Sequence, residues 1–184
     1  TGTGSAGTIS HGLGTKPELI IVKNRDTTEN WAVYHQSNTA APETDLLELN
    51  DGDATADDTV WNDTAPTSSV VTLGDGDQVN DNAVGFVAYC WAPIQGYSKF
   101  GSYIGNGNAD GPMVHTGFSP AYVVVKNAGG SEAWNVWNNK TPGFNVANKN
   151  LQPSGSVAEQ TSSSGVKSIR TPFTFFFLVI LFSY

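Results

Sequence analysis

"PELIIVKNRDTTENWAVY" (17–34) and "PAYVVVKNAGGSEAWNVW" (120–137) decide the fold, because the two stretches align without a gap at an offset of 103 residues. Lys23 falls on Lys126 in this alignment, and Asn24 falls on Asn127. Upstream, "GTGSA" (2–6) falls on "GNGNA" (105–109). Solenoids and propellers repeat every 20–50 residues or so, so a period near 100 predicts a duplicated domain.

Each aligned stretch predicts a β-hairpin. "ELIIVKN" and "AYVVVKN" are rich in β-branched residues, a short polar turn follows each, and a second strand carries the tryptophan. Trp31 and Trp134 are expected to anchor the core of each module. The alternative is that they line a platform for sugar rings.

The remaining segments predict further strands. In the first repeat these are residues 45–50, 68–74 and 83–93, and the last has apolar side chains on both faces, which is typical of a strand in the middle of a sandwich. Abundant Thr, Ser, Asn, Gly and Val also favour strands and turns. The expected fold is all-β, with two duplicated β-sandwich (jelly-roll-like) modules in tandem. The first spans residues 1–103, and the second, shorter module spans 104–184.

The chain ends in an unbroken apolar run. Residues 175–182 are all apolar, but a membrane-spanning helix needs about 20 such residues, so no membrane span is expected. The run is predicted to be a central β-strand at the place that residues 83–93 take in the first repeat. An exposed apolar strand promotes aggregation, so this strand must be covered by its own sandwich or by a neighbour.

The boundary between the repeats matches the two ends of the chain. "GSY" (101–103) precedes "IGNG" (104–107), while the chain finishes with "FSY" (182–184) and starts with "TGTG" (1–4). This match is expected if the chain is a piece of a longer array, or if subunits meet head to tail and form a filament. The residues predicted at such a self-assembly joint are Thr1, Gly2, Gly4, Phe175, Phe177, Val179, Leu181 and Tyr184.

The net charge and its distribution along the chain indicate which kinds of partner the protein is expected to bind. The net charge is −8, and residues 26–98 hold 13 of the 17 acidic side chains without one Lys or Arg. Nucleic-acid binding requires a basic face, so it is not expected. The single cysteine, Cys90, lies in an apolar run and is expected to be a buried, inert thiol.

No catalytic motif is present among those sought: nucleophile elbow, zinc-protease helix, phosphate loop or Cys-x-x-Cys. The chain is therefore not expected to be an enzyme. The loops "NDGDATADD" (50–58) and "GDGDQVNDN" (74–82) place aspartates at alternate positions, and oxygen ligands of this kind suit Ca²⁺. The candidate ligands are Asp51, Asp53, Asp75, Asp77 and Asp81. The alternative is that both loops are solvated turns.

Two further kinds of site are open. Asn62 and Asn139 begin Asn-x-Thr sequons that could accept glycans. Trp61 and Tyr97 are the candidates for stacking on sugar rings if the protein binds carbohydrate.

"HGLGTKPELIIVKNR", "VWNDTAPTSSVVTLG" and "VAYCWAPIQGYSKFGSYIGNG" resemble a β-rich repeat of phage tail-fibre-like proteins and marine bacterial surface proteins. The resemblance covers residues 1 to about 145, and it implies an extracellular or virion-surface structural role without catalytic residues. The first expectation is a structural subunit of a fibre that assembles head to tail with itself. The alternative is a lectin-like module of a tail fibre or adhesin that binds surface glycans.

Overall fold

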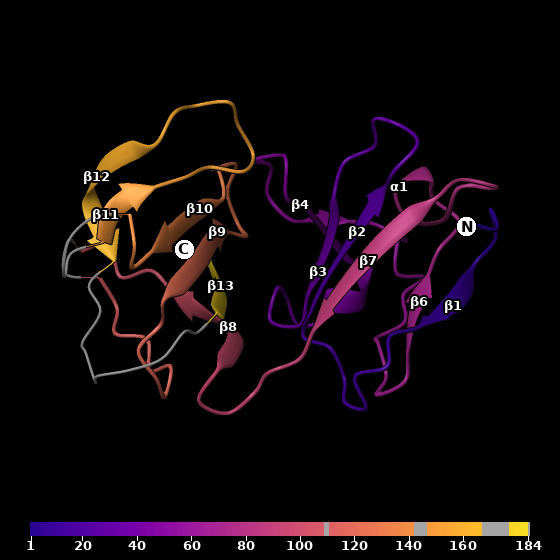
Figure 1. The fold of residues 1–184 in the computed structure, drawn as a ribbon, viewed down its shortest axis with the longest axis horizontal. Coiled ribbons are helices and arrows are strands. Elements are labelled where there is room, and N and C mark those ends of the chain that lie inside the picture. Colours follow the sequence, from indigo (N-terminus) through magenta and orange to yellow (C-terminus); the bar gives the residue numbers. More distant parts are fainter. Residues whose placement is uncertain (109–110, 142–146, 167–176, 184) are drawn as a thin grey trace.

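The computed structural model describes residues 1–108, 111–141, 147–166 and 177–183, and in these ranges the protein is all-β (Figure 1). Two short helical elements interrupt the strands, η1 (Pro42–Thr44) and α1 (Asp77–Asn80). The strands are β1 (Gly7–Ser10), β2 (Leu19–Asn24), β3 (Ala32–His35), β4 (Asp45–Glu48), β5 (Ala56–Asp57), β6 (Val70–Leu73), β7 (Phe86–Trp91), β8 (Ser98–Ile104), β9 (Tyr122–Asn127), β10 (Asn135–Asn138), β11 (Ala147–Asn150), β12 (Gln160–Val166) and β13 (Phe177–Ser183). No helix within these ranges is long and apolar enough to cross a membrane.

The duplicated hairpins form in the predicted places and in the same register. In the first repeat β2 pairs antiparallel with β3, with Ile21 opposite Val33. In the second repeat β9 pairs antiparallel with β10, with Val124 opposite Val136. These are equivalent positions at the offset of 103 residues, so the hairpin prediction is confirmed.

The first repeat forms a five-stranded sheet in the order β5-β4-β3-β2-β7, beside a two-stranded β1-β6 sheet. Alternate side chains of the larger sheet, among them Ile20, Val22 and Tyr34, pack with Val71 and Leu73 of β6 in one buried cluster. Figure 1 shows β1 and β6 on the right of this sheet. One face of the five-stranded sheet is thus covered from within its own repeat.

The second repeat contributes three strands to a four-stranded sheet in the order β10-β9-β13-β8, and it also forms a two-stranded β11-β12 sheet. The fourth strand, β8 (Ser98–Ile104), comes almost wholly from the end of the first repeat. The backbone of β13 pairs parallel with β9 on one edge and parallel with β8 on the other. The C-terminal run is therefore a central strand, as predicted. It lies beside β9 as β7 lies beside β2, although β7 is antiparallel to its neighbour.

The two large sheets share a core. One buried cluster contains Leu19, Val33 and Leu47 from the first repeat together with Val124, Trp134 and Val136 from the second. Val33 and Val136 are equivalent positions in the two repeats, and so are Ile21, which packs against the cluster, and Val124. Equivalent faces of the duplicated sheets therefore pack against each other, and Figure 1 shows the two large sheets side by side in the middle of the molecule.

Residues 83–93 are predicted to form a strand in the middle of a sandwich, and β7 has a buried cluster on each of its two faces. Within the described residues β7 pairs only with β2 and ends its sheet. Its apolar side chains alternate between the two clusters: Phe86 and Cys90 pack on the first-repeat core, and Trp91 packs on the shared core. The apolar residues on both faces of β7 therefore reflect the layers packed on both faces of its sheet, and not strand partners on both of its edges.

Candidate assembly surface

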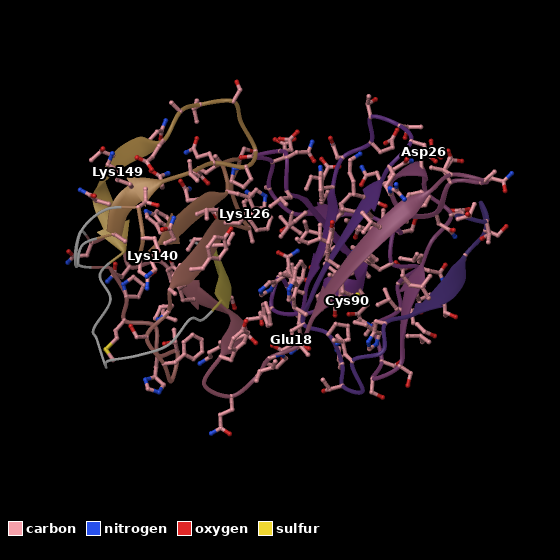
Figure 2. All side chains as sticks on the ribbon, in the orientation of Figure 1. Glu18, Asp26, Cys90, Lys126, Lys140 and Lys149 are labelled. Carbon is pink, nitrogen blue, oxygen red and sulfur yellow. The ribbon has the colours of Figure 1, made fainter. Side chains whose placement is uncertain are left out.

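A buried lysine joins the two repeats. The Lys126 side chain is 0% exposed, and its Nζ donates hydrogen bonds to the carbonyl oxygens of Gly52 at 3.1 Å, Asn127 at 2.6 Å and Gly130 at 3.0 Å. Burial lowers the pKa of Lys126, and the carboxylates of Glu132, Asp53 and Asp51 oppose this effect. Figure 2 shows Lys126 where the two halves of the molecule meet.

Two more hydrogen bonds cross the same contact. The Thr55 backbone N–H donates to the carbonyl oxygen of Ala128 at 2.9 Å, and Trp134 Nε1 donates to the carbonyl oxygen of Glu48 at 2.8 Å. A buried polar atom without a partner would cost free energy, so these bonds specify how the two repeats dock.

The equivalent lysine of the first repeat lies in a different setting. Lys23 Nζ donates to the carbonyl oxygens of Thr27 at 3.2 Å and Glu29 at 2.8 Å, both in the turn of its own hairpin. Its side chain is only half-buried. The lysine at this duplicated position therefore bonds to its own hairpin turn in both repeats. Only Lys126, in the second repeat, also bonds to a loop of the first repeat, at Gly52.

The outer edge of β7 is open. No strand of the described ranges pairs with it, and the segment "FVAYCW" carries neither a charge nor a proline. Tyr89 is 44% exposed and stacks on Trp91 with ring centroids 5.9 Å apart at 17°. Ile94 and Tyr97, both exposed, follow in the connection to β8. An apolar strand edge of this kind is a place for another strand to pair.

The outer edge of β8 is also open within the described residues. Beside β8 lies an open hollow of about 260 Å³, lined by residues of β8 and by Met113, Val114 and His115. Lys99 of β8 is exposed and donates from Nζ to the carbonyl oxygen of His115 at 2.6 Å. Thus β7 and β8, consecutive along the chain, end two different sheets.

The terminal residues predicted at the joint have backbone partners inside the chain. Gly2 donates to the carbonyl oxygen of Val84, and Gly4 donates to that of Asn80, both at 2.8 Å. Phe177, Val179 and Leu181 lie in β13, which is paired on both edges. Phe175 and Tyr184 lie outside the described residues. Neither terminal segment in the described ranges offers a free strand, so strand exchange there would require the chain to open.

The five candidate calcium ligands are not brought together as a site. Within the described ranges, no group of three or more His, Cys, Asp or Glu side chains is placed to hold a metal ion. The Asp51 carboxylate accepts a hydrogen bond from the Asp53 N–H at 3.1 Å, which is turn geometry. Asp77 begins α1.

The sugar-stacking candidates differ in exposure. Trp61 is 1% exposed, packs edge-on against Tyr34, and donates from Nε1 to the carbonyl oxygen of Asp45 at 2.9 Å. This residue is a core side chain and presents no face to a ligand, which corrects the expectation. Tyr97 is 50% exposed. Both sequon residues, Asn62 and Asn139, are exposed as well.

A buried polar group at the start of β4 was not predicted. Asp45 is buried, accepts a hydrogen bond from the Thr39 hydroxyl at 2.6 Å, and has its pKa raised mainly by that burial. Burial and nearby carboxylates likewise raise the pKa of Tyr34 to about 12. Since both side chains are closed to solvent, this arrangement offers no access to a substrate. The sequence of β4, Asp-Leu-Leu-Glu, has no polar–apolar alternation, so the sequence held no signal that placed Asp45 inside.

The sequence profile of one family, described as Domain of unknown function (DUF7483), matches residues 1–170. The comparisons with curated proteins and with solved structures found no match. The profile covers both duplicated hairpins, the buried Lys126 contact and the open edges of β7 and β8. The chain therefore belongs to the DUF7483 family.

Proposed function

We propose that the protein is a structural building block of an extracellular or virion-surface assembly, made of two tandem β-sandwich-like modules that act as one rigid unit. The observation that carries the proposal is the open, uncharged, apolar edge of β7. Natural monomeric proteins usually blunt such edges with charges, prolines or bulges, because open edges pair with other chains. An unprotected edge is best explained by a partner strand.

The shared core supports the same role. The contact around Lys126 and Trp134 ties two sheets into one unit, and a fixed relation between them suits a load-bearing repeat. The resemblance to tail-fibre-like and surface-protein repeats agrees with this proposal. The sequence predicts the joint between copies at the two termini, whereas this proposal places it at the open strand edges.

Negative-stain electron microscopy of the purified chain at increasing concentration tests the proposal. Particles that lengthen in steps of one subunit are the expected result. Uniform single particles at every concentration, in low and high salt, would refute a self-assembling structural role.

A carbohydrate-binding module is the second candidate, since Tyr89 and Tyr97 are half-exposed aromatic rings close in sequence. Aromatic rings of this type stack on sugars. Glycan-array binding that is lost in Tyr97→Ala, with no association between copies, would favour this alternative over the structural role.

A further inference from the structure

We propose that Asn106 is a site of spontaneous chemical modification, at which the side-chain amide is lost and the backbone rearranges through a succinimide ring. Asn106 and Gly107 are the single Asn-Gly pair of the sequence, and they follow directly on the end of β8 at the boundary between the repeats. The reacting groups are the Gly107 backbone nitrogen and the Asn106 side-chain carbonyl carbon. This chemistry does not depend on the structural function proposed above.

The structure leaves this pair of residues open. Asn106 and Gly107 are both exposed, and no atom outside the neighbouring residues lies within 4 Å of the place that a side-chain carbon would take at Gly107. Gly107 has a φ of 63°, which residues with a side chain rarely adopt. The Gly107 nitrogen is therefore shielded neither by a side chain of its own nor by packed neighbours.

The Asn106 side chain is turned toward the backbone that follows it. Its Oδ1 accepts a hydrogen bond from the Asn108 N–H at 3.0 Å. This bond closes a turn in which an asparagine side chain bonds to the backbone two residues on. The peptide group of Gly107 lies between the two bonded residues, so the turn keeps the amide carbon of Asn106 beside the nitrogen that attacks it.

The equivalent segment of the first repeat is closed to this reaction. Thr3 falls on Asn106 at the offset of 103 residues, and its hydroxyl side chain has no amide to lose. The Thr3 N–H donates to the Asn80 Oδ1 at 2.9 Å, and the Asn80 Nδ2 donates to the carbonyl oxygen of Ser5 at 2.6 Å. The first copy of this glycine-rich segment is thus fixed and inert, whereas the second copy is exposed and carries the reactive pair.

The reaction consumes one water and releases one ammonia. The Gly107 nitrogen attacks the Asn106 Cγ carbon, the bond from Cγ to the side-chain nitrogen breaks, and the proton lost by the Gly107 nitrogen leaves with the ammonia. Water then opens the five-membered ring at either of its two carbonyl carbons. One opening gives aspartate, and the other gives isoaspartate, whose backbone is longer by one methylene. Either product adds one negative charge to the net charge of −8.

Intact-mass spectrometry of three full-length chains, incubated at pH 8 and at pH 6, tests the proposal: wild type, Asn106→Gln and Asn108→Gln. Glutamine cannot form the five-membered ring, and Asn108 is an equally exposed asparagine two residues away. Wild type and Asn108→Gln should gain about 1 Da as an amide becomes a carboxyl group, whereas Asn106→Gln should keep its mass over the same time. The gain should be faster at pH 8, because the attacking nitrogen must lose its proton.

Transfer of a labelled methyl group by an isoaspartyl methyltransferase distinguishes the ring from direct hydrolysis, because only ring opening produces isoaspartate. Label should appear in aged wild type, map to residue 106, and be absent from that position in Asn106→Gln.

Three results would overturn the proposal. A folded wild-type chain whose mass stays constant at pH 8 would show that the loop protects the pair. A gain of mass that persists unchanged in Asn106→Gln would place the reaction at another residue. A gain of mass at residue 106 without any methyl label would exclude the succinimide route.

Discussion

Lys126 and Lys23 have equivalent places in the sequence, yet only Lys126 bonds to the other repeat, through the carbonyl oxygen of Gly52. Replacing Lys126 by Met would leave three carbonyl oxygens without their charged donor. We expect this variant to lose about 2–4 kcal/mol of unfolding free energy. Lys23→Met, which removes a half-buried donor with two acceptors in its own turn, should lose about 1 kcal/mol.

Urea denaturation of the two variants makes this comparison. Equal losses in both would mean that the lysine stabilises only its hairpin turn, and that the Gly52 bond adds nothing to the docking of the repeats.

Asp45 should make stability depend on pH. Its pKa is raised in the folded state, chiefly by burial, so folding disfavours its charged form. This penalty is present at pH 7 and disappears as pH falls through the folded pKa toward the unfolded value near about 3.9. Asp45→Asn should therefore be slightly more stable than wild type at pH 7, by less than about 1 kcal/mol, and the gain should vanish at pH 3.

The denaturation midpoints of wild type and Asp45→Asn at the two pH values provide the test. A variant that is destabilised by the same amount at both would show that the Thr39 hydrogen bond, and not the buried charge, decides the role of this residue.

Single residues were the hardest features to predict. Trp61 is a candidate from the sequence for stacking on sugar rings, but its ring fills the first-repeat core. The buried Lys126 was visible only as one half of a repeated pair. Which of two equivalent lysines is buried depends on a loop more than 70 residues away, and one sequence carries no signal for that contact.

At the scale of elements, Trp134 is the side chain that joins the sheets. It is buried in the shared core and donates to the carbonyl oxygen of Glu48, whereas the equivalent Trp31 is half-buried. Trp134→Phe should therefore cost about 2 kcal/mol, from the lost hydrogen bond and the smaller ring. Trp31→Phe should cost less than half as much.

Thermal unfolding followed by near-ultraviolet circular dichroism compares the two tryptophan variants. If Trp31→Phe proved the more damaging, each tryptophan would be anchoring its own hairpin, and the shared core would not be the main site of stabilisation.

The elements themselves were largely predictable. The duplicated hairpins, β4, β6 and the central C-terminal strand all lie where β-branched runs and turn residues place them. The position of β7 was not predictable in the same way. Alternating apolar residues report what covers the two faces of a strand, and they contain no information about the pairing of its edges.

At the scale of the whole molecule, two features lie beyond a prediction from one sequence. The two repeats meet through equivalent faces, and two uncapped strand edges remain on the outside of the described structure. Both depend on how the duplicated sheets dock, which long-range packing decides. The duplication was visible in the sequence, and it retains its importance in the assembly proposed here.

Sedimentation velocity of the wild-type chain, over a range of concentrations at about 50 mM and about 500 mM salt, tests the central claim most directly. The open edge of β7 predicts a sedimentation coefficient that rises with concentration in both salts, because open strand edges pair with other chains. A coefficient that is constant across concentration in both salts would contradict the claim that copies of this protein join one another.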